Sequence, residues 1–333
     1  MTSLSGLSHK TVLVTGGTGT FGQAFVAKLL ATSEVQKIIV FSRDEFKQSQ
    51  MQRDVSDPED RLRFFLGDVR DLSRLIRALE GVDVVVHAAA LKQVPAIEYN
   101  PLEAIKTNIV GTQNVIDAAL DSNVEKVLLI SSDKAVQPIN LYGATKLCAE
   151  RLCVAANAYR GKYRPTKFSV VRYGNVWGSR GSLIELIHKQ RPTGTVTLTD
   201  ERMTRFLIKI NDVIDIIFSA LRDMQGGEIF VPKMKSFRIC DLMKILAPGC
   251  AIKVIGVRPG EKLHETLITE HETPRTKDAG YAFVIQPEFE HESNWEHDSW
   301  LKDLPPFPVQ SSYFSNNPEL LLNSDAARAI FGV

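Results

Sequence analysis

The stretch that decides the fold is residues 11–22, which reads TVLVTGGTGTFG. An apolar run typical of a buried strand passes directly into glycines at positions 16, 19 and 22. Glycines at this spacing permit a tight turn, close approach of the backbone to a pyrophosphate, and contact between the next helix and the sheet. The N-terminus of that helix attracts the anion. The stretch therefore predicts a dinucleotide site formed by Gly16, Thr18, Gly19, Thr20, Phe21 and Gly22.

The first half of the chain alternates apolar, β-rich runs with helical patterns. The runs are continuous, as expected for strands that are covered on both faces. Strand–helix–strand repetition implies right-handed crossovers and a parallel sheet. The fold class is therefore α/β, with a doubly wound parallel Rossmann sheet over residues 1–173. Strands are expected at residues 11–14, 37–41, 62–66, 82–87, 126–130 and 167–173, and helices at 21–30, 72–79, 101–120 and 143–159.

After residue 173 the rhythm becomes irregular, which predicts a smaller mixed α/β lobe over residues 174–290 that binds the substrate, with some later segments returning to the sheet. Residues 291–333 form a C-terminal tail to which the sequence assigns no chemistry, with a helix expected at 318–331. Within the lobe, strands are expected at 196–198, 228–231 and 252–257, and helices at 183–189, 210–221 and 239–246.

Composition excludes several classes of protein. The 333 residues are 44% hydrophobic and 24% charged with a net charge of +1, so no nucleic-acid or anionic-membrane partner is indicated. Residues 1–10 have no apolar core and are not a signal peptide, and the most apolar run, 82–91, is too short and too polar to span a membrane. The cysteines lack metal-site spacing, so we expect no metal and a reduced, cytoplasmic protein with buried thiols. They are Cys148, Cys153, Cys240 and Cys250.

The tip of the second expected strand bears on the choice of dinucleotide. A carboxylate normally grips the ribose 2′-hydroxyl of NAD at this point. Here the strand ends in Ser42 and Arg43, and Arg43 with Lys47 can hold a 2′-phosphate through charge-assisted hydrogen bonds. NADP is therefore the expected cofactor, although Asp44 leaves NAD open.

Two further strand ends have side chains that suit a dinucleotide. Asp68 and Val69 follow the third strand, where the acid can accept a hydrogen bond from an adenine amino group. Ala88, Ala89 and Ala90 follow the fourth strand, where small side chains let the backbone lie against the cofactor.

The fifth strand and the next helix together predict a catalytic group. Ser132, Asp133 and Lys134 stand at the strand end, and Tyr142 and Lys146 follow in the sequence YGATK. Because residues four apart share a helix face, Tyr142 and Lys146 point the same way. The Lys146 ammonium and a positive nicotinamide should lower the pKa of the phenol from about 10. Tyr142 can then take the proton of a sugar hydroxyl, with Ser132 hydrogen-bonded to the same oxygen.

These motifs together resemble the extended short-chain dehydrogenase/reductase family, from residue 11 to about residue 285. Most members of that family act on nucleotide-activated sugars. The details are most similar to the inverting UDP-N-acetylglucosamine 4,6-dehydratases, which begin pseudaminic acid and related L-sugar pathways. The strings that carry this narrower resemblance are SRDEFKQ at 42–48, AAALKQVP at 88–95, SSDKAVQPINLYGATK at 131–146, VVRYGNVWGSRGS at 170–182, RMTRF at 202–206 and VRPGEKLHE at 257–265.

Chemistry also favours a dehydratase. Once carbon 4 of a hexose is a ketone, a base must remove the carbon 5 proton and an acid must protonate the departing carbon 6 hydroxyl. Asp133 and Lys134 add two ionisable groups where retaining dehydratases have an Asp-Glu pair, and the resemblance implies that Lys134 handles carbon 5 and Asp133 serves carbon 6. Burial and the charge of Lys146 should keep Lys134 neutral, although a proton shared by the pair leaves the division of roles open.

A UDP-sugar needs donors for two phosphates and a shaped site for uracil. Arginines and amides within the family-like strings are candidates, and the resemblance adds apolar and acidic residues around the same pocket. The expected substrate-binding residues are Lys92, Tyr173, Asn175, Arg180, Thr199, Met203, Arg205, Arg258 and Glu261.

Two other functions remain open on the sequence alone. A nucleotide-sugar 4-epimerase or reductase of the same fold needs only Ser132, Tyr142 and Lys146. A non-catalytic NADP-binding regulatory protein has no need to keep these residues together. The resemblance further implies a homo-oligomer, such as a hexamer.

Overall fold

The computed structural model describes residues 5–31, 34–161, 164–179, 181–288, 300–308 and 312–332. Its centre is a nine-stranded sheet with the order β14-β15-β10-β6-β5-β4-β1-β2-β3. The strands from β10 to β3 are parallel, whereas β15 and β14 are added antiparallel at one edge. These strands are β1 (Thr11–Thr15), β2 (Lys37–Ser42), β3 (Leu62–Leu66), β4 (Val84–His87), β5 (Lys126–Ser132), β6 (Lys167–Tyr173), β10 (Ile229–Pro232), β14 (Thr276–Asp278) and β15 (Ala282–Ile285).

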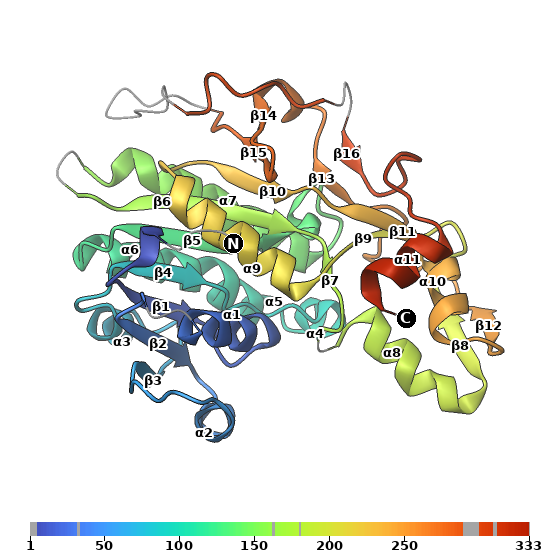
Figure 1. Cartoon of the computed structure of the whole chain (residues 1–333), viewed down its shortest axis with the longest axis horizontal. Coiled ribbons are helices and arrows are strands. Elements are labelled where there is room, and N and C mark those ends of the chain that lie inside the picture. Colours follow the sequence, from blue (N-terminus) through green and yellow to red (C-terminus); the bar gives the residue numbers. More distant parts are fainter. Residues whose placement is uncertain are drawn as a thin grey trace.

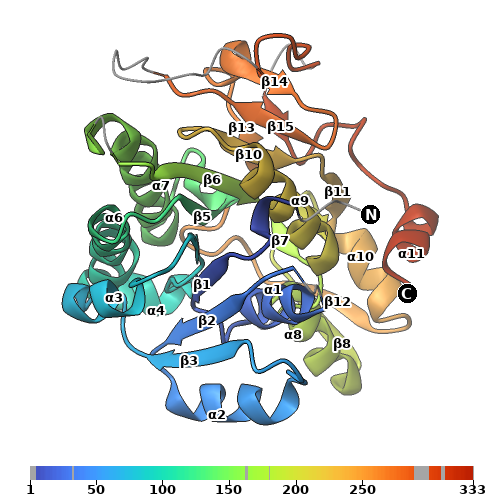
Figure 2. The same ribbon diagram turned by 60° about the vertical axis from the view of Figure 1, so that its left-hand side comes forward.

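Helices cover both faces of this sheet, as the continuous apolar strands predict (Figure 1). One face is covered by α1 (Thr20–Leu30) and α9 (Ile210–Asp223), which contact each other, and the other by α3 (Leu72–Ala78), α6 (Gly111–Asp121) and α7 (Leu141–Tyr159). Figure 2 shows the second group of helices side by side. The doubly wound parallel sheet is therefore confirmed.

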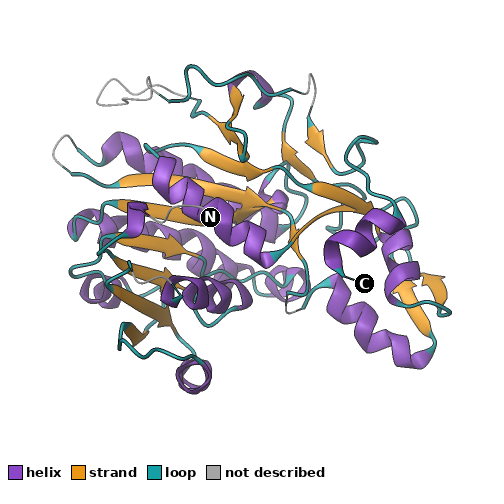
Figure 3. Ribbon diagram, in the orientation of Figure 1, coloured by secondary structure: helices purple, strands orange, loops and turns teal. Residues whose placement is uncertain are grey.

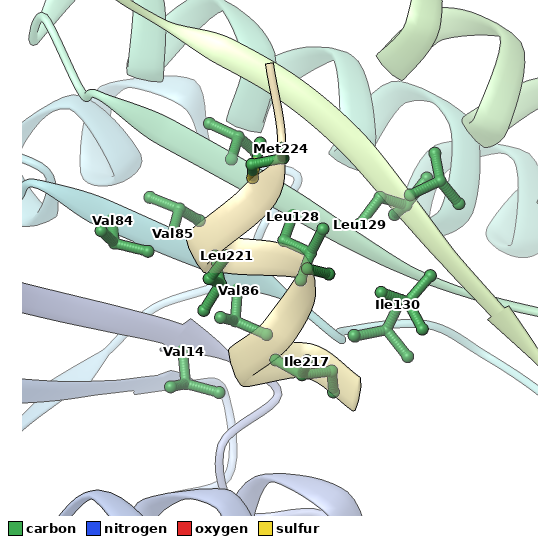
Figure 4. Close-up of a cluster of buried hydrophobic side chains, with 14 of the residues drawn as sticks. Val14, Val84, Val85, Val86, Leu128, Leu129, Ile130, Ile217, Leu221 and Met224 are labelled. Carbon is green, nitrogen blue, oxygen red and sulfur yellow. The ribbon is translucent and has the colours of Figure 1, made fainter. Parts of the chain in front are cut away.

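The core on the α9 face shows why this later helix belongs to the sheet. Ile217, Leu221 and Met224 lie over the buried side chains of β4 and β5 (Figure 4). Strand β3 is less buried than the central strands, because it forms one edge of the sheet, and its Leu66 is 46% exposed.

The smaller lobe has its own core, which is separate from that of the sheet. In Figures 1 and 3 its helices and short strands lie together beside the carboxyl ends of the parallel strands. They are α8 (Leu183–Gln190), η4 (Arg191–Thr193), β8 (Thr195–Leu198), α10 (Ile239–Leu246), β12 (Ala251–Val254) and α11 (Ser324–Phe331). A three-stranded sheet of β7 (Asn175–Val176), β9 (Thr204–Ile208) and β11 (Lys235–Arg238) joins the lobe to the main body.

The tail runs back across both parts of the molecule. Its strand β16 (Tyr313–Phe314) pairs with β13 (Thr266–Ile268), and α11 packs on α10. The helix expected at 318–331 begins only at Ser324, because Asn323 caps it by accepting a hydrogen bond from the N–H of Ala326. The remaining short helices are η1 (Ser5–Leu7), α2 (Glu45–Asp54), α4 (Val94–Tyr99), η3 (Asp133–Ala135) and η5 (Thr273–Arg275).

The single helix expected at 101–120 is wrong in detail. The segment is divided into α5 (Pro101–Ala104), the π-helical turn η2 (Ile105–Val110) and α6. Asn108 lies in the π-helical turn and is buried; its side chain pairs with both backbone groups of Leu91 and donates to Thr145 on α7. Local widening of a helix often serves a functional site, and here it fixes the loop that precedes Lys92.

The cysteines and the helices also bear on the expectations from composition. All four cysteines are free thiols, but only Cys153 is buried and Cys148 is exposed, so the expectation of uniformly buried thiols is wrong. In the described part of the chain, no helix has the length and apolar character needed to cross a membrane.

Candidate active site

A cavity of about 650 Å³ opens at the carboxyl ends of the parallel strands, where open α/β sheets bind their ligands. It brings together all of the dinucleotide residues expected from the sequence. These are Gly16, Thr18, Gly19, Thr20, Phe21, Gly22, Ser42, Arg43, Asp44, Lys47, Asp68, Val69, Ala88, Ala89 and Ala90.

The glycine-rich turn fits a dinucleotide in its backbone geometry. Gly16 has a φ of +67°, and a Cβ there would lie 2.9 Å from the Cα of Ala89. A Cβ at Gly22 would lie 2.4 Å from the Cα of Gly17, so side chains at either position would push the turn and helix apart. Gly19 is the N-cap of α1 and has no side chain to occupy the first N–H groups, which leaves that helix end suited to a pyrophosphate.

The basic tip after β2 is held by carboxylates. Arg43 lies 3.8 Å from Asp68, and Lys47 lies 2.7 Å from Asp44. Asp44 also caps α2 by accepting from the Lys47 N–H, and these contacts lower the pKa of its carboxyl. Asp44 is therefore already engaged by its own helix, whereas Arg43 is 55% exposed at the side-chain level and lines the cavity.

The neighbouring strand ends are rigidly organised. Burial raises the pKa of Asp68, but Arg70 donates to its carboxylate through the backbone and the guanidinium and brings the pKa below its ordinary value.

Thr15 accepts from the N–H groups of Ala88 and Ala89 and pairs with Nδ1 of His87. His87 is buried, and burial followed by the charge of Lys146 lowers its pKa to about 3. It is thus a structural residue of the strand end.

The residues expected to be catalytic meet because η3 packs on α7. A Cβ at Gly143 would lie 2.2 Å from the carbonyl oxygen of Lys134, so only glycine allows this contact. The Ser132 hydroxyl donates to Oδ1 of Asp133 (2.7 Å), and Lys134 Nζ donates to the same oxygen (3.0 Å). Asp133 is fully buried and its Oδ2 has no hydrogen-bond partner. Ser132, Lys134, Tyr142 and Lys146 line the cavity, and Asp133 lies behind them.

The expectation that Lys146 lowers the pKa of Tyr142 is wrong for this structure. Burial raises the pKa of Tyr142 above its ordinary value, and the cation that opposes burial is Lys134. Lys146 instead donates from Nζ to the carbonyl of Ile130 (2.5 Å), and burial lowers its pKa to about 8. The cation that lowers the pKa of the phenol therefore comes from the strand end rather than from its own helix.

The expectation of a neutral Lys134 is also wrong. Burial lowers the pKa of Lys134, but the charges of Asp133 and Glu265 outweigh burial and leave the pKa above its ordinary value. Lys146 does not contribute to this balance. Lys134 is therefore an ammonium in the resting site.

A second cavity of about 460 Å³ lies between the sheet and the smaller lobe. Lys92, Lys134 and Asn175 line both cavities, so the two cavities adjoin at these residues. Tyr173 lines the first cavity, and Arg180 lies outside the described residues. The expected substrate residues that line the second cavity are Lys92, Asn175, Thr199, Met203, Arg205, Arg258 and Glu261.

The described arginines of this cavity differ in what they can bind. Arg205 is buried and already donates to the carbonyls of Thr204, Lys262 and Leu263, so it chiefly holds the 261–265 loop. Arg258 is exposed at the rim and suits an anion. Oδ1 of Asn175 is buried without a hydrogen-bond partner, as expected of a group that awaits a ligand.

Two residues of the site were missed in the sequence. Asn108 orients the loop before Lys92 through the contacts described above, and its partners Leu91 and Thr145 lie on other segments, so no local pattern marks it. Glu265 lies 3.6 Å from Lys134, although more than a hundred residues separate them in sequence. No local pattern reveals such a contact. The described residues contain no group of three His, Cys, Asp or Glu side chains that could hold a metal.

Known proteins resemble this chain over most of its length. Residues 12–287 match the family described as polysaccharide biosynthesis protein. An inverting UDP-N-acetylglucosamine 4,6-dehydratase of Campylobacter jejuni is 48% identical over 282 residues, which are 84% of each chain. A UDP-glucose 4-epimerase of Rickettsia felis is 42% identical over 83% of this chain and 82% of its own. The crystal structure of DesIV, a dTDP-glucose 4,6-dehydratase from Streptomyces venezuelae with NAD and TYD bound, has a TM-score of 0.69 at 26% identity and covers 76% of this chain and 86% of its own. The chain therefore belongs to the polysaccharide biosynthesis protein family, within the extended short-chain dehydrogenases/reductases.

Proposed function

We propose that this protein is a hydro-lyase that converts UDP-N-acetylglucosamine to UDP-2-acetamido-2,6-dideoxy-β-L-arabino-hex-4-ulose, with inversion at carbon 5. The observation that carries the proposal is the ion pair between Lys134 and the fully buried Asp133, beside Tyr142 at the junction of the two cavities. A 4-epimerase has no use for a second acid–base pair, whereas water elimination requires one. The Campylobacter relative has the same named activity.

Each catalytic side chain has a step to perform. Tyr142 takes the proton of the carbon 4 hydroxyl, and Ser132 hydrogen-bonds to that oxygen. Lys134 removes the carbon 5 proton, the bond between carbon 6 and its oxygen breaks, and Asp133 gives the departing hydroxyl the proton that makes it water. The dinucleotide would supply a reversible hydride acceptor when bound. The hydride taken from carbon 4 would end on carbon 6, and a proton delivered to the opposite face of carbon 5 would complete the inversion, so the reaction has no net redox change.

The ion pair can reach the protonation states that these steps need. In the structure Lys134 and Asp133 form an ion pair, which is the wrong form for a base and an acid. Transfer of one proton from Lys134 Nζ to Oδ1 of Asp133, across 3.0 Å, produces a neutral amine and a neutral acid. When the sugar excludes water, two neutral groups avoid the desolvation penalty of a buried ion pair. We infer that substrate binding favours this transfer.

We further propose that the cofactor is NADP. Arg43 is exposed and lines the cavity, where its guanidinium can bind a 2′-phosphate. The Asp44 carboxylate already binds Lys47 and caps α2, so it is less able to accept a hydrogen bond from a 2′-hydroxyl. The sugar would lie between Tyr173 and Asn175 on one side and Lys92 on the other. Arg258 would meet the diphosphate, and the apolar part of the second cavity, with Met203, would receive uracil.

We also propose a homo-oligomer, with a hexamer as the expected size. The support is an apolar outer surface on α5, η2 and α7, where Leu102, Val110 and Tyr159 are exposed. The product would supply the biosynthesis of a surface glycan such as pseudaminic acid.

The proposed activity is tested by incubating the protein and catalytic NADP⁺ with UDP-N-acetylglucosamine in heavy water. We expect a sugar that has lost one water, carries deuterium at carbon 5 and shows the L-arabino configuration in its proton spectrum. An isomer of unchanged mass would instead assign an epimerase, a requirement for stoichiometric NADPH would assign a reductase, and an unchanged sugar would favour a non-catalytic role.

The role of Lys134 is tested by Lys134→Ala. This variant should still oxidise carbon 4, seen as reduced-nicotinamide absorbance, but it should lose carbon 5 deuterium exchange by about 10²-fold or more, the usual contribution of a positioned acid–base group. Lys244→Ala, an exposed change on α10, is the matched control and should behave as wild type. Undiminished deuterium incorporation in Lys134→Ala would remove Lys134 from the carbon 5 step.

A further inference from the structure

Glu265 is a buried carboxylate that the proposed mechanism does not use. It is 2% exposed and lies directly before β13. Oε1 lies 3.6 Å from Lys134 and 3.7 Å from Arg205, and Oε2 lies 3.9 Å from Lys262 and has no hydrogen-bond partner. A buried charge is retained only when its surroundings compensate it, and here the compensation comes from three cations that surround the second cavity.

The C-terminal segment holds Glu265 in this place. The N–H of Glu265 donates to Oγ of Ser315 (2.9 Å), and its carbonyl accepts from the Ser315 N–H (2.8 Å). Ser315 is fully buried and its hydroxyl also meets Oγ1 of Thr204 (2.7 Å), next to Arg205. The tail, to which the sequence assigns no chemistry, thus fixes the backbone on which this carboxylate stands.

Resting on the dehydratase function proposed above, we propose that Glu265 is a positioning residue that holds the Lys134 ammonium against Asp133 and sets the pH at which that ammonium releases its proton, with Ser315 of the tail as its anchor. It would act through Lys134 and would not touch the reacting carbons.

The charges around Lys134 determine the direction of the effect. The two carboxylates favour the ammonium, and the neighbouring cations oppose it. Removing Glu265 leaves Asp133 as the one carboxylate within 4 Å of Lys134 among the described residues, opposite uncompensated cations. Lys134 should then lose its proton at lower pH. The ionisable groups that face Lys134 are Asp133, Glu265, Arg205, Lys262, Lys92 and Tyr142.

The test compares the pH dependence of carbon 5 deuterium exchange in wild type and Glu265→Gln, both with NADP⁺ bound. The rise of the exchange rate with pH should move down by about one to three pH units in Glu265→Gln, the range for an opposite charge within a few ångströms. The KM for UDP-N-acetylglucosamine should change much less than this. Glu265→Asp keeps the negative charge, so its exchange rate should rise with pH nearly as in wild type. If Glu265 had only a structural role, the shorter carboxylate of Glu265→Asp would not be expected to keep the wild-type pH profile.

Glu261→Gln is the control, because Glu261 contacts Arg205 at 3.6 Å in the same loop without an ion pair to Lys134. Whatever its turnover, its exchange profile should rise at the wild-type pH. If Glu265→Gln does not fold, Ser315→Ala frees the same backbone and should move the rise in the same direction by a smaller amount. A rise at the wild-type pH in the folded variants would overturn the role of Glu265. An absence of carbon 5 exchange in wild type would overturn the dehydratase function itself.

Discussion

Lys134 shows how much of a residue's chemistry depends on distant parts of the chain. Its neighbours in sequence predict a reactive pair with Asp133, and in the structure Lys134 lines the cavity and forms an ion pair with Asp133, which is buried behind it. The sequence also suggests that burial leaves the amine neutral. The second carboxylate, Glu265, reverses this expectation and arrives through a loop that the tail positions. Residue type and local spacing therefore indicate where the chemistry occurs, and tertiary contacts set the protonation state in which it begins.

At the same scale, Arg43 should determine the preference for NADP. Arg43→Ala removes the exposed guanidinium at the β2 tip, and with it charge-assisted hydrogen bonds worth about 1.5–3 kcal/mol to a 2′-phosphate. The Kd of NADP⁺, measured by calorimetry, should rise about tenfold to a hundredfold, whereas the Kd of NAD⁺ should change little. Arg53→Ala, an exposed change at the end of α2, should leave both values as in wild type. Wild-type protein that binds NAD⁺ as tightly as NADP⁺ would contradict the proposed preference.

A buried ionic network joins β6, α7 and the segment from β13 to Glu272. Arg172 on β6 donates to Glu150 on α7 (2.7 Å), to Glu272 (3.0 Å) and to the carbonyl of Leu267 on β13 (2.9 Å). Ser131, beside the catalytic Ser132, also donates to Glu150. One arginine thus ties the helix of Tyr142 and Lys146 to the segment that follows Glu265.

Arg172→Leu should therefore destabilise the fold strongly. It leaves two buried carboxylates without their cation, and breaking a buried pair costs about 3–5 kcal/mol. The free energy of unfolding, measured with urea, should fall by about this amount. Arg164→Leu removes an ion pair with Asp121 between exposed side chains and should change it by less than about 1 kcal/mol. Equal small losses in both variants would show that the network contributes no more than a surface pair.

Strands and helices that show an apolar pattern in their own sequence could be predicted. Elements that form because of contacts with distant segments could not. Strands β1, β4, β5 and β6 are continuous apolar runs because helices cover both of their faces, and α10 was predicted with its observed bounds. The π-helical turn η2 was missed because its cause is the contact of Asn108 with a separate loop. The two-residue strands β7 and β16 were missed because their partners come from distant segments.

The tail and the candidate site likewise depend on contacts between distant segments, which local sequence patterns do not predict. The sequence could predict that the residues expected to hold the dinucleotide gather at one cavity, because each strand of a parallel sheet delivers its end to one edge. The substrate half depends on how the 255–265 loop folds over the cavity, and that loop is held by Arg205 and by Ser315. No periodicity or residue spacing in the sequence indicates either of these contacts.

Large apolar side chains are exposed on the outer surface of α5, η2 and α7. Leu102 is 57% exposed, Val110 is 45% exposed and Tyr159 on α7 is 51% exposed, and Ile105 is also exposed. Helix α7 packs against α5, η2 and α6, so these exposed residues lie on adjacent helices. Soluble proteins seldom leave such an apolar surface uncovered. A second copy of the chain can cover it symmetrically, because a two-fold axis places each helix pair against its equivalent.

Leu102→Glu places a carboxylate on this surface, where pairing would desolvate it. We expect wild-type protein to be an oligomer by light scattering coupled to gel filtration, and Leu102→Glu to yield particles of smaller mass with an unchanged circular dichroism spectrum. Val254→Glu is the matched control, since Val254 is 50% exposed on β12 in the smaller lobe, away from these helices. If Val254→Glu reduced the mass and Leu102→Glu did not, the subunit contact would lie on the lobe instead, and a monomeric wild type would remove the proposed assembly altogether.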